Sequence, residues 1–168
     1  MPPTATQTTI WLALICWFLA TGRRIHCQGR EDRTTRLLWT LGFAAYVAHV
    51  LLAFHFHHQW SHDAAVEDVA KQTGETTGFH WGGGIWFNHF FTLAWAVDTI
   101  HLWLRPDATS VAGQKIRNAW RGFMFFMIFN ATVVFEDGFI RWFGLAGCLT
   151  IAILLTRELR RSRLQQRS

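Results

Sequence analysis

Long apolar stretches alternate with short polar segments along this chain of 168 residues. The hydrocarbon core of a membrane is about 30 Å thick, and a helix needs roughly 17 to 25 residues to cross it. Five stretches reach or approach that length, and we predict that each forms a transmembrane helix. Their bounds are residues 4–21, 35–56, 81–104, 120–135 and 139–156. The predicted fold class is therefore an all-α, polytopic bundle of five transmembrane helices, with residues 1–168 forming a single membrane domain.

The fourth and fifth stretches are separated only by Glu136, Asp137 and Gly138. One long helix running through this point would carry two acids into the centre of the bilayer, which is energetically costly. We therefore predict a tight antiparallel hairpin with both acids at its outer turn.

The longest polar segment, residues 57–80, carries a short amphipathic pattern. Ser61 is a favourable N-cap residue, and Gly74 is a typical helix stop. Apolar or small residues share one face of the intervening helix at Val66, Val69, Ala70 and Thr73. We predict a surface helix from Ser61 to about Thr73 that is either a lid over an outer site or a cover for the ends of the spans.

Basic residues mark one side of the predicted membrane. Fourteen of the sixteen Lys and Arg residues fall in residues 22–36, 105–121 and 157–167, whereas Lys71 and Arg141 lie in the alternate loops. The positive-inside rule then places the N-terminus outside and the C-terminus in the cytoplasm. We interpret the net charge of +5 as a topology signal with affinity for anionic lipid, not as a nucleic-acid surface. The expected location is the plasma (inner) membrane of a bacterium.

Seven of the nine histidines crowd into the segment from residue 49 to residue 89. They are His49, His55, His57, His58, His62, His80 and His89. Histidine titrates near neutrality and is the commonest metal ligand, and ionisable residues at membrane depth often belong to functional sites. The crowd therefore predicts a metal, haem or proton site near the outer face.

Within this group, His49 and His89 form a pair of matched depth. Each lies about seven or eight residues inside the outer end of its span, which corresponds to roughly 10 to 12 Å. Adjacent antiparallel helices would bring both rings to one level, as bis-imidazole haem ligation or half of a metal site requires. The alternative is structural: His49 would bond to Asn88 or Thr92, and His89 to Tyr46.

Imidazoles and carboxylates nearer the surface provide a second candidate site. The predicted metal ligands are His57, His58, His62, His80, Glu136 and Asp137. Such ligands suit zinc, copper or non-haem iron. The His58-x-x-x-His62 spacing resembles one histidine box of the membrane desaturases and hydroxylases, which implies a di-iron centre, but no HxxHH box follows. The alternative is a set of interfacial polar residues that hold no metal.

A separate polar pair, Asp98 and His101, lies nearer the inner end of the third span. An acid inside a span needs a partner, and both His101 and Arg105 are within helical reach. The three residues predict either a proton relay or a structural ion pair.

Signatures of soluble enzymes are absent from the sequence, including the phosphate loop, the dinucleotide fingerprint, GxSxG and HExxH. Three functions fit what remains, and they leave open whether the protein is an enzyme. It could bind haem or a transition metal (Cu, Fe or Zn) for electron transfer or oxidation, or be a non-catalytic subunit or scaffold with structural histidines and no cofactor. It could also have a transport or proton-linked role through Asp98 and His101. The expected partners are the lipid bilayer and either a second copy or a larger membrane complex.

Overall fold

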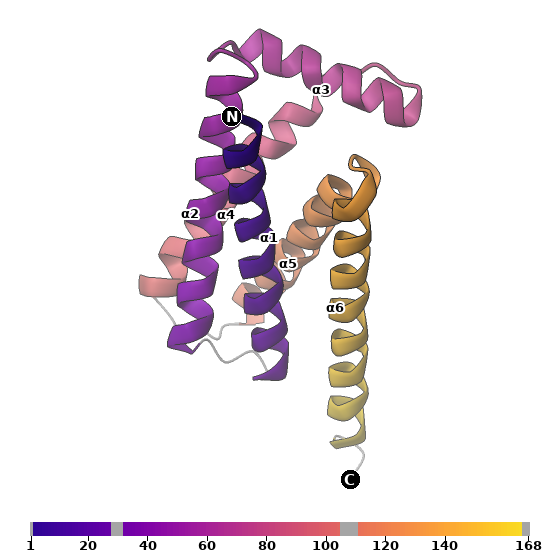
Figure 1. The fold of residues 1–168 in the computed structure, drawn as a ribbon. Helices are drawn as coiled ribbons and strands as arrows, with labels where there is room; N and C mark the ends of the chain where they lie inside the picture. The colour runs from indigo at the N-terminus through magenta and orange to yellow at the C-terminus, as the bar shows by residue number, and fades with distance from the viewer. Residues whose placement is uncertain (1, 28–31, 105–110, 166–168) are drawn as a thin grey trace.

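The computed structural model describes residues 2–27, 32–104 and 111–165, and every regular element in them is helical. The elements in chain order are α1 (Pro2–His26), α2 (Arg33–Phe56), α3 (His62–Thr77), α4 (Gly84–Leu104), α5 (Val111–Phe129), the π-helical turn η1 (Asn130–Val134) and α6 (Gly138–Gln165) (Figure 1). Five of them run along the long axis of the molecule, and α3 lies across one end. The predicted all-α architecture is confirmed.

Three helical segments are long and apolar enough to cross a membrane: Ala5–His26, Arg33–Phe56 and Gly138–Glu158. They correspond to the first, second and fifth predicted spans. The helices α4 and α5 are not among these segments; α4 carries Asn88, His89, Asp98 and His101, and α5 begins with a basic, polar turn. Length and composition therefore support three spans directly.

The antiparallel helices α1 and α2 make the most extensive helix contact, and α4 also packs against α2. Gly42 makes this approach possible, because a Cβ atom there would lie 3.2 Å from Cys16 Cβ and 3.4 Å from the Trp95 ring. The buried core that joins the helices is rich in aromatic residues. Its members are Leu14, Trp17, Ala20, Trp39, Phe91, Trp95, Leu102, Met124 and Ile128.

The turn between α1 and α2 is held by Asp32, the N-cap residue of α2. Its Oδ1 accepts hydrogen bonds from the backbone N–H and the hydroxyl of Thr35, and its Oδ2 lies 2.5 Å from Arg23 Nη2. The Thr35 side-chain hydrogen bond, the Arg23 hydrogen bond and the Thr35 backbone hydrogen bond lower the pKa of Asp32 to about 2. A single carboxylate thus caps one helix and ties it to the preceding one.

Beyond the far end of α2 the chain turns sharply and enters α3. Gln59 and Trp60 have positive φ angles of 48° and 61°, which reverse the chain direction. Ser61 Oγ then accepts the backbone N–H of Ala64 at 3.2 Å, so the predicted N-cap is confirmed. The predicted stop at Gly74 is wrong, since the helix continues to Thr77. It ends at Gly78, whose φ of 78° supplies the left-handed conformation that closes a helix.

The predicted hairpin after the fourth stretch is present, and residues 135–137 connect η1 to α6. The fourth predicted span, residues 120–135, falls within a longer helical segment, because α5 already begins at Val111 and η1 ends at Val134. The turn η1, which follows α5, is π-helical: Phe135 N–H donates to Asn130 O at 3.0 Å, a hydrogen bond between residues five positions apart. Close packing of Thr132 against Gly144 accompanies this wider turn.

Candidate functional site

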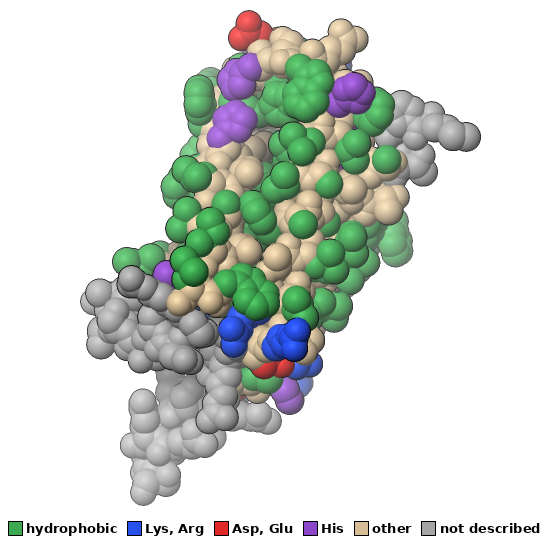
Figure 2. Space-filling view, turned by 90° about the vertical axis from the view of Figure 1, so that its left-hand side faces the viewer, with side chains coloured by type: hydrophobic (Ala, Val, Ile, Leu, Met, Phe, Trp, Pro, Cys, Tyr) green, Lys and Arg blue, Asp and Glu red, His purple; other side chains and the backbone are tan. Residues whose placement is uncertain are grey.

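The histidine-rich end of the molecule lies opposite its basic end. Figure 2 shows hydrophobic side chains over the middle of one face, with histidines near its upper end and Lys and Arg near its lower end. The upper end is where α2 ends, α3 crosses and α4 begins (Figure 1). We call this region, from His49 and His55 to His89, the histidine layer.

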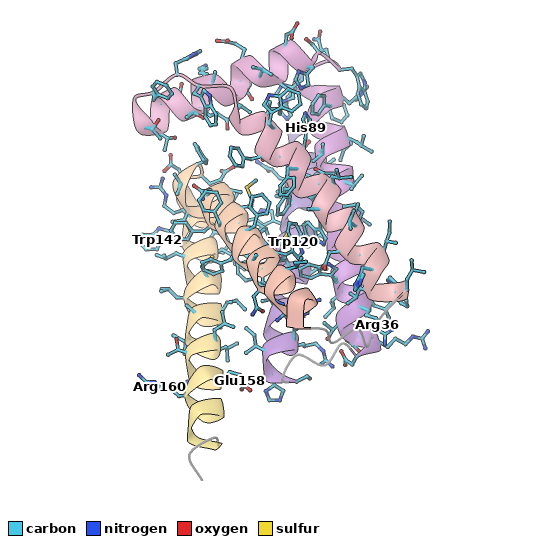
Figure 3. All side chains as sticks on the ribbon, turned by 180° about the vertical axis from the view of Figure 1, so that it is seen from behind. Arg36, His89, Trp120, Trp142, Glu158 and Arg160 are labelled. Carbon is cyan, nitrogen blue, oxygen red and sulfur yellow. The ribbon has the colours of Figure 1, made fainter. Side chains whose placement is uncertain are left out.

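Two imidazoles of the histidine layer face each other directly. His62 is the first residue of α3 and His89 lies in the second turn of α4 (Figure 3). Their Nε2 atoms are 3.3 Å apart, and the two rings are inclined by 25° with centroids 5.5 Å apart. The indole of Trp86 lies beside both rings, at centroid distances of 5.7 Å from His62 and 5.8 Å from His89.

The fold brings this pair together across 27 positions of sequence. The reversal at Gln59 and Trp60 returns the chain toward α4, and α3 then rests on the glycine-rich start of that helix. A Cβ atom at Gly82 would lie 2.6 Å from Val66 Cγ1, so only glycine permits this approach. The predicted inward face of the surface helix, which contains Val66, therefore fixes the position of His62.

His49 has a different partner, since its Nδ1 donates to the backbone carbonyl of Thr6 in α1 at 2.9 Å. In a neutral ring this bond places the proton on Nδ1 and leaves the lone pair on Nε2. Metal-binding histidines commonly have this tautomer, with the second nitrogen held by a carbonyl. The same bond also serves a purely structural role, because it joins α1 to α2.

The expected proximity of His49 and His89 is only partly realised. The helices α2 and α4 are neighbours, and the Tyr46 hydroxyl lies 3.1 Å from Thr92 Oγ1 between them. However, His49 bonds to Thr6 in α1, and His89 to His62 in α3. Both rings thus make interhelical contacts, but with partners other than those expected. Joint haem ligation through the Nε2 atoms would require His89 to leave His62, whereas the bond of His49 to Thr6 could remain.

The other predicted metal ligands are dispersed around the outer end. His80 Nε2 lies 3.4 Å from Glu67 Oε1, and Asp137 Oδ1 lies 2.8 Å from Arg141 Nη2. His57 caps the end of α2, and His58 packs its ring against Phe54. Across residues 2–27, 32–104 and 111–165, no three His, Cys, Asp or Glu side chains gather closely enough to hold a metal ion.

Glu136 stands apart from this group, at the turn between η1 and α6. Arg141 Nε donates to its backbone carbonyl at 2.8 Å, while the Arg141 Nη2 atom pairs with Asp137. Partial loss of solvent and the nearby Asp137 carboxylate raise the pKa of Glu136. The carboxylate forms no ion pair with any cation in the part of the chain that the structure describes.

A second polar region lies toward the basic end, around Asp98 in α4. Its Oδ2 atom is buried without a hydrogen-bond partner, and its electrostatic neighbours are Arg24 of α1, Arg121 of α5 and His101. The indole of Trp120, labelled in Figure 3, lies close to this carboxylate but does not reach hydrogen-bond geometry. The predicted partner Arg105 lies outside the described residues.

Arg24 is the partner that sequence reasoning missed. It is only 6% exposed, and its guanidinium carbon lies 4.5 Å above the Trp39 ring. The predicted first span ends at residue 21, which leaves Arg24 in a loop, whereas α1 continues to His26 and carries it into the bundle. Arg24 lies ten residues after Leu14 and seven after Trp17, and both of these residues belong to the core. This helical spacing places Arg24 on the buried face of α1 and could have predicted its burial from the sequence.

Comparison of the chain with protein-family models, curated proteins and solved structures found no match in any of the three.

Proposed function

We propose that this protein is a five-span membrane protein that binds a transition-metal ion on its outer face through His62 and His89, for electron transfer or oxidation. The carrying observation is the 3.3 Å separation of the two Nε2 atoms. Two imidazoles on one tetrahedral zinc or copper ion, each bonded at about 2.0–2.1 Å, would have nitrogens about 3.3 Å apart. The pair would need little rearrangement to accept an ion.

The inclusion of α4 among the spans is supported by its outer surface. Apolar side chains on one face of this helix are between 56% and 74% exposed. They are Trp86, Phe90, Leu93, Val97, Ile100 and Leu104. Helical spacing of three and four residues makes them one continuous stripe, which contact with lipid would cover. The polar residues of α4, which lower its hydropathy, lie mainly on other faces.

Two protein ligands leave coordination positions for water or a substrate, an arrangement more typical of a reactive metal than of a structural one. The exposed His62 ring makes the ion accessible from outside. We expect affinity below that of four-ligand structural zinc sites. Zinc, copper and iron all accept imidazole ligands, so the proposal names transition-metal ions as a class and not one element.

The test is metal binding by the purified, full-length protein. One Cu²⁺ or Zn²⁺ ion per chain is expected by elemental analysis after dialysis, and each of H62A and H89A should weaken binding at least tenfold. H80A and H55A serve as controls, since these imidazoles lie at the same end with other partners. A protein that binds no metal, or equal losses in all four variants, would contradict the proposal and favour structural histidines. An absorption spectrum with a Soret band lost in H49A and H89A would instead indicate haem.

A proton-linked role is a second candidate, and it is favoured by the unpartnered Oδ2 atom of Asp98. Ionisable groups that lie between helices at membrane depth are typical of proton paths. The nearby Arg24 and Arg121 would interact electrostatically with the Asp98 carboxylate. Reconstitution in vesicles with a pH-sensitive dye tests this role. Proton flux that is lost in D98N supports it, and flux that survives the substitution counts against it.

A further inference from the structure

A cleft runs into the bundle between α1, α4, α5 and the η1–α6 turn. Its volume is ≈ 80 Å³, well below the few hundred Å³ of pockets for drug-sized ligands. The walls are mainly apolar, and the lining includes four aromatic side chains and three polar ones. They are Trp11, Tyr46, Phe91, Trp95, Asn88, Thr132 and Glu136.

The aromatic wall is held rigidly. Tyr46 stacks on Trp95 with ring centroids 5.6 Å apart, and Phe91 packs edge-on against both, at 5.1 Å from Tyr46 and 5.3 Å from Trp95. The hydrogen bond between the Tyr46 hydroxyl and Thr92 fixes the end of this stack. On α1, Trp11 also lines the cleft and packs against Phe143 at 4.9 Å. Aromatic faces held in this way attract cations as well as apolar groups.

Glu136 adds negative charge to the same cleft. Arg141, the basic residue next to the turn, pairs with Asp137 and leaves the Glu136 side chain without a cation among the described residues. A carboxylate beside aromatic faces, in a small apolar cleft, is complementary to a positively charged group attached to a small hydrophobic body.

We propose that this cleft binds a small hydrophobic organic cation of the arylammonium or alkylammonium class. The apolar body enters between Trp11 and the Tyr46–Trp95 stack, and the ammonium group lies toward Glu136. This site is separate from the proposed metal site and does not depend on it.

The experiment measures binding of isobutylammonium, an alkylammonium ion small enough for this cleft, to the purified, full-length protein in nanodiscs by equilibrium dialysis, with a chelator present so that no metal contributes. Saturable binding is expected, with about tenfold weaker affinity in E136Q. The control E75Q removes the same charge from an exposed position on α3 and leaves the Arg141–Asp137 pair intact, so it should bind as the wild type does. A second pair of variants tests the contribution of the aromatic wall. W11A should weaken binding severalfold. W142A should not, because the Trp142 indole is 68% exposed and lies outside the cleft (Figure 3).

Three results would overturn the proposal. Absence of saturable binding would show that the cleft does not take this class of ligand. Equal weakening in E136Q and E75Q would indicate general surface charge instead of a site. Full competition by neutral isobutanol, with no effect of E136Q, would identify an apolar cleft that does not recognise charge.

Discussion

At the level of single residues, the hydrogen-bonding partner of each imidazole decides what that ring can do. His49 donates to a backbone carbonyl, so its Nε2 keeps a lone pair, and the His62–His89 pair either shares one proton or faces a common ion. Histidines only a few positions away, such as His55, instead accept from an indole N–H. Crowding in the sequence therefore does not predict equivalent chemistry.

Asp32 provides a test of stability at this level. Its folded-state pKa of about 2 lies below the ordinary value of 3.8, so the ionised carboxylate stabilises the fold above the unfolded pKa, and that contribution is lost as pH falls through the folded one. We expect D32A to lower the Tm by several degrees at neutral pH, because the cap and the Arg23 contact both disappear. D32N should lower it less, since Asn also caps helices.

Thermal unfolding of the three proteins in detergent between about pH 7 and about pH 3 checks this prediction. The gap between wild type and D32N should narrow as the pH falls. A gap that is constant with pH would contradict the assigned role of the Arg23–Asp32 pair.

At the level of helices, the close contact between η1 and α6 depends on the absence of a side chain at Gly144. A Cβ atom at Gly144 would lie 2.2 Å from Thr132 Oγ1 and 2.4 Å from Thr132 Cβ, and Thr132 is only 1% exposed. We expect G144A to destabilise the protein by about 1–3 kcal/mol, as overpacked cores usually do. The matched control is G122A in α5, where a Cβ atom meets nothing within 4 Å and the better helix propensity of Ala should be neutral or stabilising.

Denaturation monitored by circular dichroism distinguishes the two glycine variants. Equal stability of G144A and G122A would mean that the tight approach of η1 to α6 is not required. Because Ala131 and Thr132 of η1 also line the cleft, G144A should weaken isobutylammonium binding as well.

At the level of the whole molecule, hydrophobic spacing was sufficient to predict helices, the hairpin and the Ser61 cap, because each depends on nearby residues. The predicted helix stop at Gly74 is wrong because Gly74 lies inside α3, next to His80, and the sequence does not reveal that contact. The helix ends instead at Gly78, which has the positive φ that a left-handed C-cap requires. The contacts of His49 with Thr6 and of His62 with His89 span 43 and 27 positions, and the pairing of distant helices decides them. The sequence predicts matched depth for His49 and His89 from their positions in the spans, but it does not predict ring direction, which depends on the neighbouring helices.

The orientation of the whole chain can be tested with its own cysteines. Cys16 and Cys148 are each 3% exposed, so a membrane-impermeant maleimide should react mainly with Cys27, next to Arg23 and Arg24 at the basic end. If that end faces the cytoplasm, Cys27 is protected in intact cells and labelled after permeabilisation.

Glu75, exposed on α3, supplies the opposite reference. In a C27A background, E75C should be labelled in intact cells, because α3 lies at the histidine-rich end. Labelling of Cys27 but not E75C in intact cells would invert the orientation and place the His62–His89 pair in the cytoplasm. Labelling of both positions before permeabilisation would mean that an even number of spans separates them, which would remove α2 from the proposed spans. Protection of Cys27 together with reaction at E75C is the one pattern that leaves α2 crossing the membrane and the metal pair accessible from outside.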